Sequence, residues 1–185
     1  MSALIKFFMV LFGMALGIAL VGAPYFSSLF SLENKGEVKI NEQIIVVDIV
    51  RDADTRAKGL AGRAGLGVNE GMLFLFDEAA RYPFWMKGVS FPIDIVWISG
   101  NEIVGVEERV PPEPGVSEHD LKNYVPPAPV DKVLELAAGR ARLLRAKAGD
   151  VVKVRRLIAG GARLLSFDEI SETVHEWGAQ YRGGR

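Results

Sequence analysis

The 185-residue chain contains no cysteine and only two histidines, and these absences exclude several kinds of chemistry. Without cysteine the protein can form no disulfide, no thiolate metal site and no cysteine nucleophile, although its redox compartment stays undetermined. The histidines are isolated and no Gly-x-Ser-x-Gly segment is present, so a Ser-His-Asp triad has little support. A net charge of −1 likewise gives no support to binding of nucleic acid.

Charged side chains are also missing from residues 7–26, which are almost wholly apolar. About 20 such residues are the length that an α-helix needs to cross the hydrocarbon core of a membrane. The segment has no polar face, which argues against a buried helix of a cytosolic protein. We therefore expect either an uncleaved membrane anchor or a cleaved signal peptide ending at Val21-Gly22-Ala23, although Pro24 is unfavourable just after a cleavage site.

Both interpretations place the rest of the chain beyond the membrane. Lys6 and the N-terminal amine precede the apolar segment, and positive charge tends to stay on the cytoplasmic side. We expect the protein in the cell membrane with its domain facing the periplasm or exterior, or exported after cleavage. The expected organisation is an anchor or signal peptide with a tether at 1–31, a β domain at 32–157 and a C-terminal amphipathic helix at 158–185.

Alternating or continuous apolar runs predict a mainly β (β-rich α+β) domain. The strands are expected at 37–41, 43–50, from Met72 onward, 93–99, 102–107, 133–136 and 151–154. Two short helices are expected, one over 56–61 that starts on capping residues at 52–55, and one over 137–147. The proline-rich stretch 110–130 predicts a long extended loop, and loops of this length are usually functional or mobile.

The end of the chain predicts an amphipathic helix, because Ser166–Glu169 has the arrangement of a capping box. Its apolar residues recur at spacings of three and four, namely Phe167, Ile170, Val174, Trp177 and Tyr181. Two heptads are too few for a coiled coil, so we expect the helix to pack on the domain or to dock a protein partner. The basic run between Gly139 and Leu164 is typical of a solvated surface or of attraction to anionic lipid headgroups.

Several short motifs occur in an order that is typical of one family. They are Gly59-Leu60, Arg63, Leu66, Gly71-Met72-Leu73-Phe74, Phe84-Trp85-Met86-Lys87, Pro92-Ile93-Asp94-Ile95, Val133-Leu134-Glu135-Leu136, Gly139 and Gly149-Asp150. From about Val38 to Val154 the chain therefore resembles the domain-of-unknown-function 192 family, also called uncharacterised protein family 0127. The resemblance implies a jelly-roll-like β-sandwich or barrel with short edge helices, and it implies no reaction because the family's function is not established.

The chain departs from the family's usual pattern at two places. Gly88-Val89 stands where the family usually has Asn-Thr after the lysine, and Ala61 stands where it usually has methionine. A function that depended on the asparagine side chain would be in doubt in this protein.

The candidate site is drawn from five residues of these motifs, Arg63, Trp85, Lys87, Asp94 and Glu135. Asp94 lies among aliphatic neighbours, where an ionised carboxylate is costly unless it is paired or hydrogen-bonded. One interpretation is that Asp94 accepts backbone N–H bonds and caps the turn at 85–87. The other places Asp94 with Lys87, Arg63 and Glu135 around a polar pocket under Trp85. Glu135 has a further alternative, a solvent-facing position on an edge strand.

Metal and cofactor sites are not predicted. Glu118-His119-Asp120 are adjacent on an extended chain, so their side chains point in opposite directions and are unsuited to sharing one ion. The glycines between Gly62 and Gly71 lack the strand-loop-helix frame and the lysine of a phosphate-binding loop. We therefore expect neither a metal nor a nucleotide cofactor.

The sequence favours a binding module over an enzyme and establishes no reaction. We expect a small-ligand-binding or envelope-associated interaction module that contacts the membrane through its N-terminal helix, has a small-molecule or protein partner and binds no nucleic acid. The alternative is a hydrolase-type enzyme that uses Asp94, Lys87 and Glu135. It requires these three side chains to converge on an accessible cavity with a perturbed carboxylate pKa.

Overall fold

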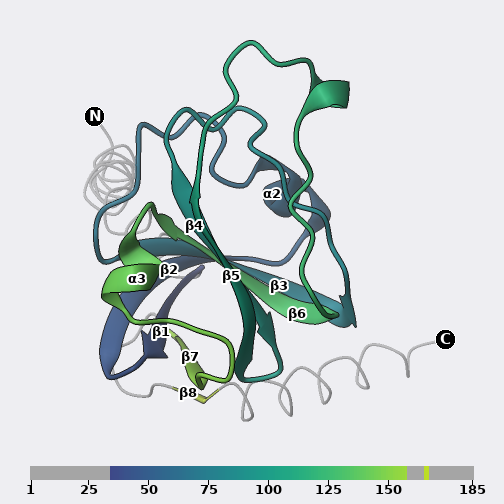
Figure 1. Cartoon of the computed structure of the whole chain (residues 1–185). Helices are drawn as coiled ribbons and strands as arrows, with labels where there is room; N and C mark the ends of the chain where they lie inside the picture. Colours follow the sequence, from purple (N-terminus) through teal and green to yellow (C-terminus); the bar gives the residue numbers. More distant parts are fainter. Residues whose placement is uncertain (1–33, 158–164, 167–185) are drawn as a thin grey trace, which may run out of the picture. The chain divides into compact units, whose positions relative to one another are not determined.

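The computed structural model describes residues 34–157 and 165–166, which form a β-rich domain (Figure 1). The N-terminal segment 1–31 and nearly all of the C-terminal helix expected at 158–185 lie outside the described residues. Within the part of the chain that is described, no helix is long and apolar enough to cross a membrane.

A single mixed sheet of eight strands has the order β5-β4-β6-β3-β2-β1-β7-β8. The strands are β1 (Lys35–Ile40), β2 (Gln43–Val50), β3 (Glu70–Ala80), β4 (Ile93–Ser99), β5 (Glu102–Val110), β6 (Val130–Ala137), β7 (Val152–Arg156) and β8 (Leu165–Ser166). All neighbours are antiparallel except β2 and β3, which run parallel. The mainly β class is therefore confirmed, and the parallel pair is a departure from an all-antiparallel jelly roll.

One end of this sheet, β5, approaches the start of β7, which lies next to the other end, without forming a closed barrel. β5 and the residue before β7 share one isolated bridge, between Glu102 and Val151. Next to it, the backbone N–H of Ile103 donates to the carbonyl of Asp150 at 2.9 Å. A single bridge is not a ladder, so the described sheet stays open.

The helix expected over 56–61 is present with earlier bounds, as α2 (Ala53–Lys58). Asp52 caps its first turn, because Asp52 Oδ1 accepts a hydrogen bond from the backbone N–H of Thr55 at 2.8 Å. The proline-rich segment between β5 and β6 is extended, as expected, apart from one 3-10 turn, η1 (Glu118–Asp120).

The second helix, α3 (Arg140–Leu143), is shorter than the helix expected over 137–147. It follows Gly139, which has a left-handed backbone with φ of 81°. Arg145 also has a left-handed backbone, with φ of 54°, and the chain leaves the helix there. Favourable helix-forming residues on either side therefore do not extend α3, because the two left-handed positions limit it.

Both faces of β4 and β6, and of β3 over residues 71–75, are buried, which explains the continuous apolar sequences there. On the first face, Leu73 and Val96 pack with residues of β1, β2, β7 and α3. On the second face, Phe74 and Trp97 pack with side chains from the segments that follow α2, β3 and β5. The second face carries the pocket described below.

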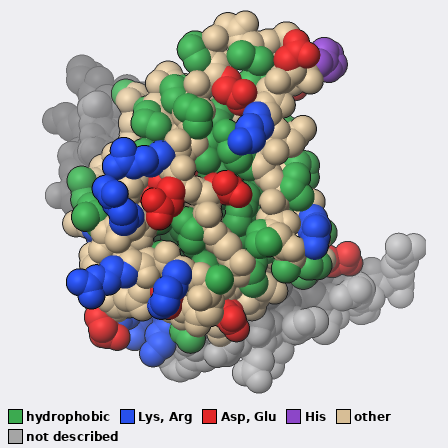
Figure 2. Space-filling model, viewed as in Figure 1, with side chains coloured by type: hydrophobic (Ala, Val, Ile, Leu, Met, Phe, Trp, Pro, Cys, Tyr) green, Lys and Arg blue, Asp and Glu red, His purple; other side chains and the backbone are tan. Residues whose placement is uncertain are grey.

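The basic residues near the C-terminal end of the domain are mostly on the surface. Figure 2 shows Lys and Arg side chains gathered on the side of the molecule where α3 lies. The exposed members of the run are Arg142, Arg145, Lys147, Lys153 and Arg155. Arg140 differs, since it is buried and its Nη2 donates to Asn69 Oδ1 at 2.9 Å. A solvated surface accounts for most of the run, and attraction to anionic lipid stays a prediction.

Candidate functional site

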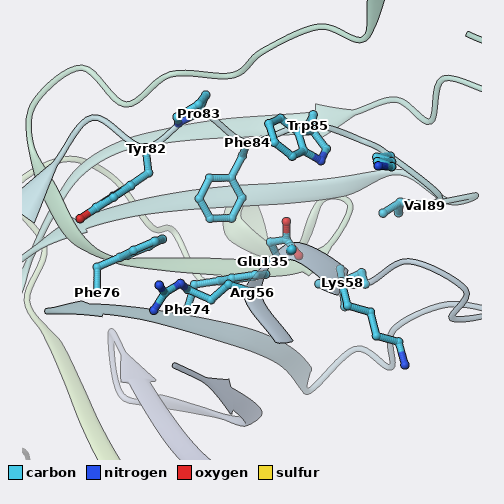
Figure 3. A pocket seen from close by; sticks show the side chains of 14 residues that line it. Arg56, Lys58, Phe74, Phe76, Tyr82, Pro83, Phe84, Trp85, Val89 and Glu135 are labelled. Atoms are coloured by element: carbon cyan, nitrogen blue, oxygen red, sulfur yellow. The ribbon is translucent and has the colours of Figure 1, made fainter. Parts of the chain in front are cut away.

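A cavity of about 260 Å³ opens on the second face of the sheet, between α2, β3 and the segment that joins β3 to β4 (Figure 3). Its lining is mostly apolar, with three basic residues and one acidic residue. The lining residues are Arg56, Ala57, Lys58, Gly59, Leu60, Phe74, Phe76, Tyr82, Pro83, Phe84, Trp85, Lys87, Val89 and Glu135. A few polar groups converging in a largely apolar hollow is the usual composition of a small-molecule site.

Aromatic rings that contact one another form the wall of the cavity. Phe76 and Tyr82 are stacked with ring centroids 3.8 Å apart, and Phe74 and Phe84 meet edge to face at 5.0 Å. Phe84 also meets the buried ring of Trp97 behind the wall at 5.5 Å. These contacts hold the rings in place without a ligand, so the wall is preorganised. Trp85 is 43% exposed and extends the aromatic surface to the mouth of the cavity.

Glu135 is the only acidic residue in the lining of this cavity. It belongs to β6, where it lies between Met72 of β3 and Ile95 of β4 in the register of the sheet. The residue is only 4% exposed, and its Oε2 has no hydrogen-bond partner. Figure 3 shows its carboxyl group within the cavity, between the side chain of Phe84 and the α2 residues. The alternative of a solvent-facing edge position is therefore wrong, because β6 is an interior strand and both of its faces are covered.

The environment of Glu135 favours the protonated acid. Burial raises its pKa from 4.5 to about 8, and the nearby positive charge of Arg63 opposes this shift only in part. At neutral pH the carboxyl group of the empty pocket is therefore mostly neutral. A neutral carboxyl can donate one hydrogen bond and accept others, whereas a carboxylate there would need a compensating cation.

Three basic side chains line the cavity, and each is more exposed than Glu135. Arg56 lies over the ring of Phe76 at 4.9 Å from its centroid, and its Nη1 donates to the carbonyl of Leu75 at 3.1 Å. Lys87 pairs with Glu118 of η1 at 2.6 Å, and the hydrogen bond from Lys87 lowers the pKa of Glu118. Lys58 is exposed at the end of α2. An anionic ligand group would therefore meet favourable charge at the mouth.

Arg63 does not line this cavity and instead binds Asp48. Its Nη2 lies 2.7 Å from Asp48 Oδ2, while Lys35 Nζ lies 2.5 Å from Asp48 Oδ1. Burial disfavours ionisation of Asp48, but the hydrogen bonds from Lys35 and Arg63 outweigh it and lower the pKa of this carboxyl. Arg63 therefore acts on Glu135 only through its charge.

Asp94 is fully buried on the opposite face of the sheet, with 0% exposure. Its Oδ1 accepts backbone N–H bonds from Arg109 at 2.8 Å and Gly139 at 3.0 Å, and its Oδ2 accepts one from Ala141 at 2.8 Å. The expected role as a backbone acceptor is confirmed, but the expected turn at 85–87 is wrong. Successive residues of β4 alternate between the two faces, so Asp94 points away from that turn and joins the end of β5 to the start of α3.

The structure thus brings together three of the five predicted site residues, Trp85, Lys87 and Glu135, and separates Arg63 and Asp94 from them. The sequence interpretation missed the aromatic wall. A usable signal was present, because Phe74 and Phe76 follow Met72 at a spacing of two and therefore share its face of β3. The contribution of Tyr82 and Phe84 had no such signal, since they lie in an irregular segment.

The segment Glu118-His119-Asp120 makes contacts of other kinds. Glu118 pairs with Lys87, and Asp120 Oδ2 accepts a hydrogen bond from Ser117 Oγ at 2.6 Å. Among residues 34–157 and 165–166 there is no group of three or more His, Cys, Asp or Glu side chains that could hold a metal ion.

These features define a β domain with a small aromatic pocket that contains one buried carboxyl group. The family model described as "Uncharacterized ACR, COG1430" matches residues 36–154, so the chain belongs to the domain-of-unknown-function 192 family. The family expectation from the sequence motifs is therefore confirmed.

Two solved structures are similar to this chain, and both are bacterial. One is a protein from Sinorhizobium meliloti 1021, provisionally described as a transcription regulator, with 28% identity, a TM-score of 0.56 and coverage of 64% of this chain and 90% of that chain. The other is a protein of unknown function from Novosphingobium aromaticivorans DSM 12444, with 28% identity, a TM-score of 0.55 and coverage of 64% and 82%. No curated protein matches the chain.

Proposed function

We propose that this domain is a binding module for a small organic molecule, which occupies the cavity between α2 and β3. The observation that carries the proposal is the carboxyl group of Glu135, which is buried in that cavity and has no partner for Oε2. An unsatisfied buried oxygen costs about 1–3 kcal/mol, and a ligand that supplies a donor recovers this energy. The aromatic wall adds apolar contact area that is already in place before binding.

The hydrolase alternative receives less support from the site. Its three residues do not share a cavity, because Asp94 is held by backbone amides on the opposite face. What still favours acid-base chemistry is a single observation, the pKa of about 8 for Glu135, since an effective proton donor has a pKa near the working pH. Binding requires only the features present, so we favour the binding module.

Trp85→Ala is expected to weaken ligand binding much more than it weakens the fold. Trp85 is half-exposed at the mouth of the cavity, so its removal should lower affinity about tenfold or more and change the free energy of unfolding by less than about 1 kcal/mol. A thermal-shift screen of small organic molecules with the full-length chain would supply ligands, because any binder raises the apparent stability. Affinities would then be compared by calorimetry.

Leu143→Ala is a matched control for this experiment. Leu143 is also a large exposed apolar residue, but it belongs to α3 and lies outside the cavity. Its replacement should leave affinity unchanged. Equal affinities for wild type, Trp85→Ala and Leu143→Ala would show that the screened ligands bind elsewhere, and a screen without any binder would count against the proposed function.

We further propose that the domain works beyond a membrane, tethered by residues 1–31 or released after cleavage. The support is the uncharged apolar run at 7–26 preceded by Lys6. Mass spectrometry of the mature protein distinguishes the two forms, because a first residue at Pro24 would rule out the anchor. Recovery of the full-length chain from the soluble cytoplasmic fraction would contradict both.

A further inference from the structure

We propose that the ligand of the aromatic pocket carries a protonated amine, which enters first and pairs with Glu135 at the buried end. This inference rests on the proposed function and assigns the chemical class of the ligand. It follows from three features, namely the unpartnered acid, the aromatic wall and the arrangement of charge around the cavity.

The first feature is that Glu135 needs a hydrogen-bond donor and tolerates a positive charge. Oε2 is buried without a partner, and the nearest residues across the sheet, Met72 and Ile95, offer no side-chain donor. An ammonium group can donate to this oxygen and neutralise the carboxylate at the same time. Bonds between ionised partners are shorter and about twice as strong as neutral ones, so an amine gains more here than an alcohol of the same shape.

The second feature is the wall around this acid, which suits a cation. The rings of Phe74, Phe84 and Trp85 line the cavity, and aromatic faces attract positive charge by about 0.5–2 kcal/mol. The same wall already holds one cation, since the guanidinium of Arg56 lies 4.9 Å from the centroid of Phe76. An anionic group in the same place would face both the quadrupole of the rings and the acid.

The third feature is the polarity along the pocket. Glu135 is only 4% exposed, whereas Arg56 is half-buried and Lys58 and Lys87 are exposed, so the basic side chains lie nearer the solvent than the acid. This arrangement orients a ligand with its ammonium group inward and its apolar or anionic end outward. The charge of Lys87 is already shared with Glu118 at 2.6 Å, which lowers the barrier to entry of a cation.

The test compares three probes of the same skeleton on the full-length chain: 2-phenylethylamine, 2-phenylethanol and 3-phenylpropionate. Calorimetry at pH 7.5 is expected to show the amine binding at least about tenfold more tightly than the alcohol, with the propionate weakest. Because the empty pocket holds a proton on Glu135 up to about pH 8, amine binding should release close to one proton at pH 6.5. Its affinity should therefore rise by up to about tenfold per pH unit towards pH 8.

Glu135→Gln separates this mechanism from other sources of pH dependence. The variant keeps the shape of the side chain and is expected to lose at least about tenfold in amine affinity and all proton release, while alcohol binding is retained. Other titratable or charged groups around the acid are Arg56, Lys58, Arg63, Lys87 and Tyr82, and any contribution from them would persist in the variant. Leu143→Ala again serves as the control that changes nothing.

The outcomes distinguish this inference from the proposed function. If the alcohol binds as tightly as the amine, or if amine affinity does not depend on pH, the pocket binds ligands but does not select an ammonium group. If none of the three probes binds and the wider thermal-shift screen also finds no binder, both the inference and the proposed function are wrong.

Discussion

Replacing Glu135 by glutamine is expected to make the ligand-free protein more stable than the wild type at pH 8, by at most about 5 kcal/mol, and to leave its stability nearly unchanged at pH 4.5. The reason is that Glu135 keeps its proton in the folded protein up to a pKa of about 8, whereas its ordinary value of 4.5 applies to the unfolded chain. Glutamine has almost the same shape and no charge to desolvate at any pH. The gain in stability is therefore expected only above pH 4.5, where Glu135 would be ionised in the unfolded chain but stays protonated in the folded protein.

The direction of this effect follows from proton uptake. Below pH 4.5 the carboxyl group is protonated in both states, so its titration contributes no difference. Between pH 4.5 and about 8 only the folded state retains the proton, and each pH unit lowers the free energy of unfolding by about 1.36 kcal/mol. Above this range the folded protein contains a buried carboxylate and the loss is complete. A protonated amine in the pocket should offset part of that loss.

Urea unfolding of wild type and Glu135→Gln at pH 5, 6.5 and 8 measures this difference. Glu108→Gln is a suitable control, because Glu108 also belongs to a strand but is exposed on β5. Its curve should follow that of the wild type throughout. A constant difference between wild type and Glu135→Gln over the three pH values would contradict the assigned environment of the carboxyl group.

Replacing Asp94 by alanine is expected to lower the free energy of unfolding by about 3 kcal/mol or more. The substitution leaves the backbone N–H groups of Arg109, Gly139 and Ala141 without their acceptor in the interior. Each unsatisfied buried donor costs about 1–3 kcal/mol, although water entering the space would reduce the sum. Since domains of this size are stable by only about 5–15 kcal/mol, this loss would remove a substantial part of the total stability.

Asp94→Asn tests the same hydrogen bonds with a side chain of nearly the same shape. Its amide oxygen can still accept from Arg109 and Gly139, but the NH2 group faces the N–H of Ala141, so the loss should be intermediate. Asp77→Asn, at an exposed position of β3, should change stability by less than about 0.5 kcal/mol. Urea unfolding followed by the signal of buried Trp97 would rank the three variants.

Ligand binding by Asp94→Asn then separates a structural role from a role in the site. Asp94 lies on the face of the sheet opposite the cavity, so a folded Asp94→Asn protein should bind pocket ligands as the wild type does. A large loss of affinity without a comparable loss of stability would indicate that Asp94 takes part in ligand binding, and it would support the hydrolase alternative.

The contrast between Asp94 and Glu135 shows which part of the site a sequence can predict. Both are single carboxylates within apolar strands, and the pattern correctly marks each as unusual. The roles of the two carboxyl groups differ because Asp94 faces backbone N–H groups at the start of a helix and the end of a strand, whereas Glu135 faces a cavity lined by aromatic rings. That difference depends on segments that are distant in the sequence. The period-two alternation of a strand cannot predict which of them will pack against each carboxyl group.

Local patterns were sufficient for most of the fold. The β class, the position of most strands and the cap at the start of α2 could be predicted from the sequence alone, because alternation and capping depend on neighbours within a few positions. The short motifs were also sufficient to predict the family. The helix over 137–147 was overestimated, since two left-handed backbone positions limit α3.

The order of the strands, the parallel pairing of β2 with β3 and the contents of the pocket become visible only in the folded chain. Pairing between distant strands is set by the burial of two sheet faces at once, which no local window contains. The pocket joins α2, β3, β6 and the irregular segment after β3, so its aromatic wall and buried acid meet only when the sheet is assembled. The same assembly removes water from Glu135, and this desolvation gives an ordinary glutamate its raised pKa.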